Sequence, residues 1–522
     1  MSDNPHSAAL DQFVSRRLAA NSMMGGLRFA VTAGVYLAVY PFMLHSLGPS
    51  QFGLWALLCI PSQYIALGDL GISSALIKLV SESHPHKDNL RLSQLAGAGV
   101  LIFTIVGGTL TGMTFLWQNG ILDWLRIQPV FLSDARVLLL GMAAVIWLTL
   151  LGNVYVALLS GLHRMDLAHV VQMCNAVLNA LGIVFALTWH LGLTGLLLSS
   201  ALTAVVTWFL AVFLVRRIAR VRWMILPRIS WSATRSLVSF GVYMYAAALS
   251  ALLMEPSIKI LLSRYGSLEL VSFFEIASRV VTQVRSFFNN IMHPLLPASS
   301  LLMLDTTRIR DLFTRSMRLL WLTAIPVFVT LSILAAPLMR VWLGRSVPLA
   351  QGALSILAFG WLLNILTLPA YFLVQGMNHP RSAMWCSVIQ GAICVGGSYL
   401  LIPRVGFYGA IGSEAAGLFV AAAYIFWRFT LLCPVHSRDI FSNSTVRALG
   451  LPVLFGGALW GISHSPAAHF MWAWILTVSA VCVLYLKLLY RRASEGFTSI
   501  EVLRGYLPIE SRDVKMIQGM MS

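Results

Sequence analysis

Polar and charged side chains gather on one side of a helix predicted over residues 269–293. At 100° per residue they occupy one half of the helical wheel, while the apolar residues occupy the other. The polar set is Glu275, Ser278, Arg279, Thr282, Gln283, Arg285, Ser286, Asn289 and Asn290. Charge inside a membrane costs about 2.5–3.5 kcal/mol per residue on insertion scales, so this helix is expected to face other helices or water.

Cations exceed acids in this region. Arg285 has no acid at helical spacing, whereas Glu275 and Arg279 are four residues apart, as are Glu255 and Lys259 in the preceding span. The guanidinium fork of arginine can bind two phosphate oxygens at once, so the surplus indicates an anionic substrate. The alternative stays open that each pair only neutralises itself and allows its helix to insert cheaply.

A thinner polar stripe follows the first apolar segment, with Asn21, Gly25, Arg28, Thr32 and Tyr36 spaced three or four residues apart. We expect it to face the same cavity as the stripe over 269–293, which would place Arg28 beside the substrate. Arg28 at the end of a span could equally be a topological anchor.

Four acids lie within predicted spans and are candidates for coupling to a proton or sodium gradient: Asp69, Glu255, Glu275 and Glu414. Asp69 stands between Gly68 and Gly71, which favours a local break in the helix. Its alternative role is to cap that break where helices pack closely. Glu414 lies among small residues, and serves either as a proton site or as a hydrogen-bonding group between helices.

Other chemistry has no support in the pattern. There is no GxxxxGK[ST] loop, no His/Glu metal constellation and no set of nucleophile, base and acid. We therefore predict no enzyme activity, no metal and no cofactor beyond an ion gradient.

Composition defines the elements that must carry these side chains. Of 522 residues, 58% are hydrophobic and 11% charged, against roughly 45–50% and 25% in soluble domains. These values exclude a soluble enzyme, a disordered chain and a disulfide scaffold. The net charge of +17 is explained by Lys and Arg in cytoplasmic loops rather than by nucleic acid.

Fourteen segments are apolar and long enough to cross a membrane. They lie near 23–46, 53–79, 93–117, 137–160, 167–190, 193–215, 237–262, 269–293, 319–341, 347–374, 383–402, 407–427, 448–464 and 469–489. With a cytoplasmic N-terminus, 27 of the 36 Lys and Arg residues fall inside and 6 outside. This asymmetry predicts that both termini are cytoplasmic.

Two segments match when one is shifted by about 214 residues. Gly182, Gly192, Gly195 and Ser199 correspond to Gly396, Gly406, Gly409 and Ser413. The match predicts an all-α polytopic protein with two six-helix bundles, over 23–215 and 237–430, related by a pseudo-two-fold axis along the membrane normal. A cytoplasmic N-terminus (1–22), a basic inter-lobe loop (216–236), two extra C-terminal helices (431–490) and a cytoplasmic tail (491–522) complete the predicted organisation.

Several motifs resemble the bacterial flippases of O-antigen and exopolysaccharide repeat units, in the multidrug/oligosaccharidyl-lipid/polysaccharide exporter superfamily. They are Leu47-Gly48-Pro49-Ser50-Gln51-Phe52-Gly53-Leu54-Trp55, Gly68-Asp69-Leu70-Gly71-Ile72, Phe273-Phe274-Glu275-Ile276-Ala277-Ser278-Arg279 and Pro294-Leu295-Leu296-Pro297-Ala298. The family often has twelve spans, and fourteen resembles its lipid II flippase branch.

The resemblance implies alternating access in the bacterial inner membrane, with a polyprenyl-pyrophosphate-linked oligosaccharide moved from the cytoplasmic to the outer leaflet. A polysaccharide polymerase and chain-length proteins are the implied protein partners, besides membrane lipid. In this scheme the head group binds Arg279, Arg285, Arg28 and Lys259. The cavity is lined by Ser278, Thr282, Ser286, Asn289, Thr32 and Tyr36.

Two rival functions are kept open. A multidrug or cation antiporter of the same fold would need a cavity with net negative charge. The charges within the spans over 237–262 and 269–293, apart from Glu269 at the outer end, are instead Glu255 and Glu275 against Lys259, Arg279 and Arg285. A membrane-embedded polymerase or ligase would need a large outer loop, and the longest predicted one, at 118–136, is short.

Overall fold

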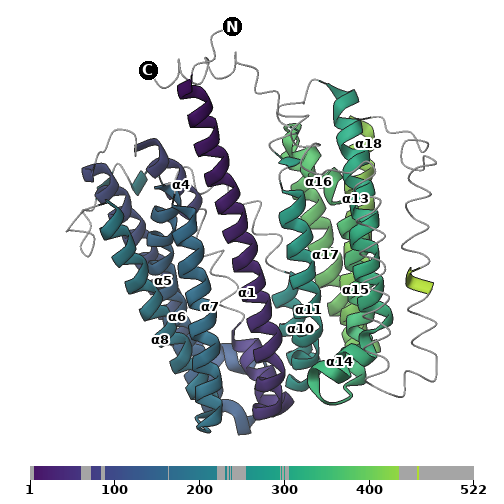
Figure 1. Cartoon of the computed structure of the whole chain (residues 1–522). Helices are drawn as coiled ribbons and strands as arrows, with labels where there is room; N and C mark the ends of the chain where they lie inside the picture. The colour runs from purple at the N-terminus through teal and green to yellow at the C-terminus, as the bar shows by residue number, and fades with distance from the viewer. Residues whose placement is uncertain are drawn as a thin grey trace. The chain divides into compact units, whose positions relative to one another are not determined.

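The computed structural model describes residues 5–59, 72–83, 89–162, 164–219, 254–293 and 305–433. It also describes 230–231, 234–235, 237, 295–296, 299 and 455–457. This part of the chain forms fourteen α-helices and one short 3-10 helix, with no strand among them (Figure 1). Nine of the described helices or joined helices are long and apolar enough to cross a membrane. The predicted all-α polytopic class is confirmed.

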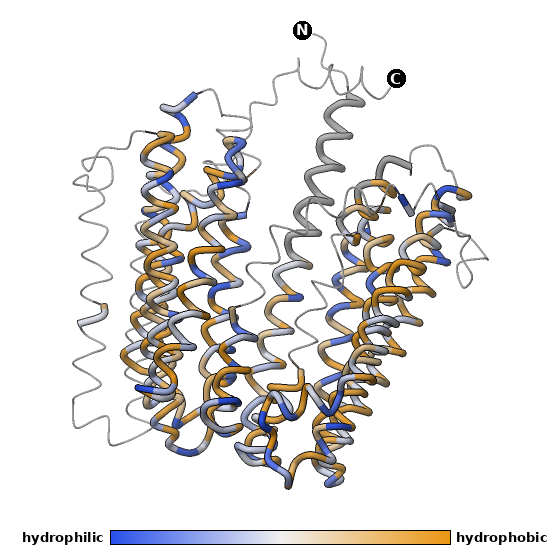
Figure 2. Tube along the Cα trace, turned by 180° about the vertical axis from the view of Figure 1, so that it is seen from behind, coloured by the Kyte–Doolittle hydropathy of each residue, from blue (hydrophilic) through white to orange (hydrophobic). Residues whose placement is uncertain are grey.

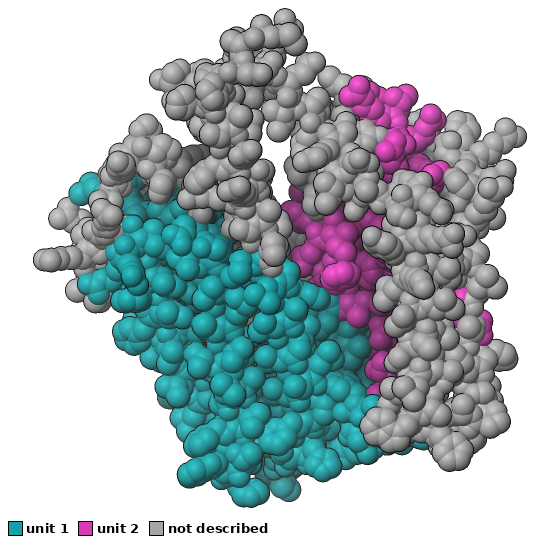
Figure 3. All heavy atoms as spheres, viewed as in Figure 1, with its two compact units in different colours: residues 1–283, 339–353, 387–417 teal, residues 284–338, 354–386, 418–522 magenta. Residues whose placement is uncertain are grey.

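Two compact units make up the chain (Figure 3). The first comprises residues 1–283, 339–353 and 387–417, and the second comprises 284–338, 354–386 and 418–522. The boundaries of these two units do not coincide with those of the predicted lobes over 23–215 and 237–430. The two lobes therefore stay a prediction.

The first unit contains α1 (Pro5–Leu58), α4 (Ile72–Ser83), α5 (Asn89–Trp124), α6 (Leu132–Gly161), α7 (Met165–Thr188), α8 (Gly192–Ala219) and α10 (Met254–Tyr265). It also holds most of α11 (Leu268–Met292) and parts of α17 (Pro380–Val405) and α18 (Phe407–Leu432). The core of α4 to α8 is aliphatic and aromatic, with Leu76, Phe103 and Leu150 fully buried. On the outside, Leu116, Leu181 and Leu198 are more than 60% exposed, as lipid-facing positions should be. Long hydrophobic stretches follow the same helices in Figure 2.

Helix α1 joins the first predicted span to the start of the second. The two parts are separated at Gly48, whose φ of 76° is left-handed and is followed by Pro49. Beyond this kink the chain lies close to the start of α11, because a Cβ on Gly53 would run into the backbone carbonyl of Leu268. This close approach brings α1 against α11, where the candidate site lies.

The internal repeat has a structural counterpart. Gly182 of α7 packs against Ser199 of α8, and Gly397 of α17 packs against Ser413 of α18. Each second helix also starts at or directly after a glycine with a positive φ: Gly192, the first residue of α8, has a φ of 57°, and Gly406, directly before α18, has a φ of 70°. The packing therefore recurs near the predicted offset, with one difference: Gly397, not Gly396, faces the serine. A Cβ built on Gly396 would have no neighbouring atom within 4 Å.

The second unit holds α13 (Thr306–Ile333), α16 (Leu368–Gly376), the end of α11, most of α15 (Pro348–Leu366) and parts of α14 (Ala335–Leu343), α17 and α18. Helix α13 begins thirteen residues before the predicted start of the ninth span. Asp305 caps it by accepting a hydrogen bond from the amide of Arg308, at 3.1 Å. The predicted tenth span is broken at Thr367, which precedes α16, and Pro369 lies in the first turn of that helix.

Some expectations lie outside the described residues. These are the middle of the second predicted span (60–71) with Asp69, residues 238–253 of the seventh, both C-terminal spans apart from 455–457, and the tail. The predicted outer loop at 118–136 is mostly helical, because α5 continues to Trp124 and α6 begins at Leu132.

Candidate functional site

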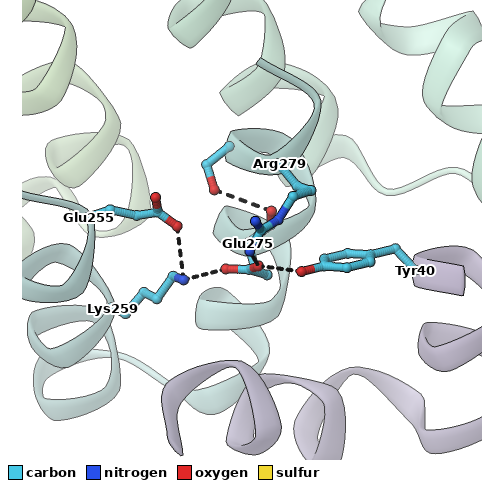
Figure 4. Close-up of polar contacts among 6 residues, drawn as sticks. Tyr40, Glu255, Lys259, Glu275 and Arg279 are labelled. Atoms are coloured by element: carbon cyan, nitrogen blue, oxygen red, sulfur yellow. Dashed lines mark hydrogen bonds and ion pairs between the residues drawn. The ribbon is translucent and has the colours of Figure 1, made fainter. Parts of the chain in front are cut away.

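Three helices of the first unit bring charged and aromatic side chains to one buried point (Figure 4). Helix α1 supplies Tyr40, α10 supplies Glu255 and Lys259, and α11 supplies Glu275 and Arg279. Each pair is spaced four residues apart on its helix, so both members point the same way. We call Tyr40, Glu255, Lys259, Glu275 and Arg279 the charge cluster.

Glu275 is the centre of the charge cluster and is 2% exposed. Its Oε1 accepts hydrogen bonds from the Tyr40 hydroxyl at 2.8 Å and from Nη2 of Arg279 at 2.6 Å. Its Oε2 forms an ion pair with Lys259. The carboxylate is thus stabilised by two cations and one hydroxyl, which is the condition for keeping a buried charge.

Lys259 is enclosed between two acids. Its side chain is 0% exposed, and Nζ lies 3.0 Å from Oε1 of Glu255 in addition to its pair with Glu275. The ammonium therefore offers no accessible face to a ligand in this conformation. Its role here is to hold the two carboxylates, and thereby α10, against α11.

Arg279 is the more accessible cation of the charge cluster, at 23% side-chain exposure. Its guanidinium lies over the rings of Tyr36 and Tyr40, 5.2 and 5.3 Å from their centroids, within the range of cation–π attraction. Its Nε is buried and donates no hydrogen bond to any residue that the structure describes. Arg279 thus keeps a donor that its present partners do not use.

The charge cluster carries two acids and two bases, so its formal charge is zero. Removing one member of such a buried set costs about 3–5 kcal/mol, because the remaining charge is left uncompensated. The spacing in the sequence predicted the pairs within each helix. It did not predict the Lys259–Glu275 pair between helices, nor the contribution of Tyr40. The available signal for Tyr40 was that it continues the Thr32–Tyr36 stripe by one turn.

The other predicted cations lie in other places. Arg28 of α1 donates from Nη1 to Oε1 of Gln172 on α7, at 2.5 Å. Arg285, in the second unit, is exposed and its guanidinium lies 4.2 Å from the centroid of the Trp361 ring.

The predicted polar lining is partly buried. Ser278 is 6% exposed and donates to the backbone carbonyl of Glu275 at 3.2 Å, so it serves its own helix. The remaining predicted lining residues are half-buried: Thr32, Tyr36, Thr282, Ser286 and Asn289. On the opposite side of α11, Ile276, Ala277 and Val281 are fully buried.

Glu414 of α18 is 6% exposed, beside Cys394 of α17. It lies on a different helix pair from the charge cluster. Among the described residues, no group of three or more His, Cys, Asp or Glu side chains is placed to hold a metal ion.

Comparison with known proteins identifies the family. A model of the polysaccharide biosynthesis protein family matches residues 46–347. The chain belongs to this family. The match includes the whole charge cluster except Tyr40, and it confirms the resemblance drawn from the motifs.

Individual relatives agree with the assignment. A Shigella flexneri protein named "Putative O-antigen transporter" is 18% identical over 426 residues, covering 80% of this chain and 99% of the relative.

Solved structures share the fold. The lipid II flippase MurJ in an inward closed conformation superposes with a TM-score of 0.70 at 11% identity, over 90% of this chain and 99% of the flippase. An inward-facing multidrug resistance MATE family transporter of the MOP superfamily gives a TM-score of 0.67 at 16% identity, over 81% and 99%.

Proposed function

We propose that this protein is a flippase of polysaccharide biosynthesis. It moves a polyprenyl-pyrophosphate-linked oligosaccharide from the cytoplasmic to the outer leaflet of the bacterial inner membrane, with both termini in the cytoplasm. The family match, the O-antigen transporter relative and the fold shared with a lipid II flippase support this proposal. So does the physics of the cargo, since a diphosphate and many hydroxyls cannot cross hydrocarbon unaided.

The observation that carries the proposal is the balanced charge cluster with one accessible cation. A diphosphate arriving beside Arg279 competes with Glu275 for its guanidinium, because both offer two oxygens to the same planar fork. If the diphosphate takes Arg279, Glu275 loses a partner and gains affinity for a proton or a sodium ion. Substrate binding and ion binding are then linked through one side chain, and each changes the affinity for the other by the same factor.

The remaining candidates take supporting roles in this scheme. Lys259 holds Glu255 and Glu275 while Arg279 is engaged elsewhere, and the half-buried polar residues of α1 and α11 line the route. Arg28 and Arg285 provide further positive charge for the head group. Glu255, Asp69 and Glu414 remain the alternative sites of ion coupling.

The proposal is tested in cells that lack the protein. Mass spectrometry combined with a leaflet-accessibility probe should show a pyrophosphate-linked oligosaccharide accumulating on the cytoplasmic face. The wild-type gene should clear it. Arg279→Ala should not, although the variant protein is inserted in the membrane.

The matched control is Arg308→Ala, which removes an arginine whose side chain is 59% exposed and should restore export fully. Unchanged export with Arg279→Ala would contradict the role of Arg279. Cells without the protein that accumulate no such lipid but become sensitive to cationic drugs would instead point to a multidrug antiporter. Accumulation on the outer face would point to a polymerase or ligase.

A further inference from the structure

A second polar feature of the first unit is separate from the charge cluster. A half-enclosed cavity of about 160 Å³ lies among α6, α7 and α8. Its polar lining comes from Thr149 and Asn153 of α6, Gln172 and Asn175 of α7, and Thr207 and Trp208 of α8. Two of these face each other, since the amide nitrogen of Asn175 donates to the Thr207 hydroxyl at 3.3 Å.

The chemistry of the lining selects a neutral, hydrogen-bonding ligand. None of the lining residues is charged, so neither a cation nor an anion would find its charge compensated there. The threonine hydroxyls of the lining already donate to backbone carbonyls of their own helices. A wholly apolar ligand would still cover the side-chain amides without bonding to them, which is costly. Amide and hydroxyl groups both donate and accept, so they suit a ligand that carries several hydroxyls.

The indole of Trp208 adds an unsatisfied donor. Its Nε1 is buried and has no hydrogen-bond partner in the part of the chain that the structure describes. An indole N–H can only donate, so it calls for an acceptor such as a hydroxyl or ring oxygen. The same side chain offers a flat apolar face. A ligand with oxygens on its edge and C–H groups on its face satisfies both.

The size of the cavity matches a single six-membered ring. A cavity of about 150 Å³ holds one benzene molecule, and a water occupies about 30 Å³. Since the cavity is only half enclosed, further sugar units or a linked group can extend out of it.

Arg28 places positive charge next to this cavity. Its Nη1 donates to Oε1 of Gln172 at 2.5 Å, and Gln172 is a lining residue. A guanidinium one side chain away from a neutral polar cavity fits a sugar whose anomeric carbon bears a phosphate group.

We propose that this cavity binds the pyranose ring attached directly to the diphosphate of the cargo, with Arg28 facing the diphosphate. The identity of the cargo in this inference rests on the proposed function. The sugar site itself rests on the side chains that line the cavity. On α6 the lining residues lie five to twelve residues before Gly161, or about 8–18 Å by helical rise. That end of α6 is the one predicted to be cytoplasmic, where the cargo is loaded.

Binding is measured by saturation-transfer NMR on the full chain in detergent, using glucose, galactose and N-acetylglucosamine as probes. Sorbitol is the matched control, because it is the open-chain polyol related to glucose and has no ring. We expect saturation of the ring protons of at least one sugar and none for sorbitol. Asn153→Leu and Asn175→Leu should each weaken binding about tenfold, since each removes a hydrogen-bonding amide from the half-buried lining.

Asn179→Leu is the matched control variant. Asn179 donates to Ser200 at 3.3 Å, the same kind of α7–α8 bond one turn from Asn175, and it does not line the cavity. Gly152→Ala covers the case in which the Leu variants fold poorly. Its added methyl would lie 3.8 Å from Trp208, so it narrows the cavity without removing a hydrogen bond, and it should also weaken sugar binding.

No ring-proton signal in the wild type, or equal signals in the wild type, Asn175→Leu and Gly152→Ala, overturns the sugar site. The export assay separates this result from failure of the proposed function. If Asn175→Leu cells export normally while Arg279→Ala cells do not, the result supports the flippase proposal and contradicts the sugar site. Sugar binding that depends on the lining, in a protein whose loss causes no lipid-linked intermediate to accumulate, keeps the sugar site and removes the flippase.

Discussion

Glu275 neutralises Lys259 and Arg279, and the Lys259 side chain is fully buried. Glu275→Gln keeps the size of the side chain but removes its charge, so Lys259 and Arg279 lose their shared partner. We expect a loss of about 3–5 kcal/mol in the free energy of unfolding. Thermal unfolding of the purified protein in detergent measures it. Glu269→Gln, on the exposed first turn of the same helix, should change stability by less than about 0.5 kcal/mol. Similar melting temperatures for both variants would contradict a buried charge cluster.

The two tyrosines of α1 have separable roles. Both rings lie near the guanidinium of Arg279, but only the Tyr40 hydroxyl donates to Glu275. Tyr40→Phe should therefore cost about 1.5–3 kcal/mol, the range for a hydrogen bond to a charged group. Tyr36→Phe keeps its ring in place and should cost less than about 0.5 kcal/mol. Equal losses in the same unfolding experiment would mean that the Tyr40 hydroxyl does not contribute to the charge cluster.

At this scale the sequence yields the four charged residues of the charge cluster, but neither Tyr40 nor all of the pairings between them. Glu255 with Lys259 and Glu275 with Arg279 follow from helical spacing alone. The pair between Lys259 and Glu275, and the burial of Lys259, depend on how α10 packs against α11, which no local pattern encodes.

Among the elements, α1 meets α11 at a point where no side chain fits. A Cβ on Gly53 would overlap the backbone carbonyl of Leu268, and backbone cannot move aside cheaply. Gly53→Ala should therefore lower the amount of folded protein in the membrane and its melting temperature. Gly34→Ala, in the same helix with nothing within 4 Å of its Cβ, should be neutral or stabilising by up to about 1 kcal/mol. Equal behaviour of the two variants would argue against this close approach.

Helix α13 depends on its cap and hence on pH. The Thr307 hydroxyl and the Arg308 amide both donate hydrogen bonds to the Asp305 carboxylate. These bonds, chiefly the one from Thr307, hold the pKa of that carboxyl below its usual value. A lowered pKa in the folded state means that the cap stabilises the protein at neutral pH and that this contribution is lost as the pH falls through the folded-state pKa. Asp305→Ala should lower the melting temperature at pH 7 and flatten its decline in acid. Asp305→Ser, another good cap residue, should retain most of the neutral-pH stability but not the acid dependence.

The cap also explains where the prediction of helices falls short. The apolar core of α13 was located from hydropathy, but its first three turns are polar and carry Arg308, Arg310 and Arg315, so a search for apolar segments begins too late. The break at Thr367 was missed in a similar way, since it lies inside the predicted span over 347–374. The kink at Gly48 falls between the predicted spans over 23–46 and 53–79, but hydropathy did not show that the helix resumes directly after it. Hydropathy reports which residues avoid water, and not where the backbone turns.

For the whole molecule, fold class and family could be predicted because their signals are spread over hundreds of residues. Low charge, long apolar runs and a repeat near 214 residues can each be recognised even when the boundaries of individual segments are wrong by a few residues. The repeat appears in the structure as the same glycine–serine packing in two helix pairs, a relation that requires only small residues at a fixed offset.

Two gradients can set the direction of transport: the membrane potential acts on the diphosphate, and a pH gradient acts on the charge cluster. An inside-negative membrane potential favours outward movement of a diphosphate by about 2.3 kcal/mol per charge per 100 mV. Exchange of a proton at Glu275 would add a dependence on the pH gradient. In proteoliposomes with a fluorescent polyprenyl-diphosphate glycolipid, we expect both gradients to accelerate flipping by the wild type. Glu275→Gln should respond to the potential alone, because an amide cannot titrate. A pH response that persists in Glu275→Gln but disappears in Glu414→Gln would transfer the coupling to α18, and a response to a sodium gradient only would replace the proton.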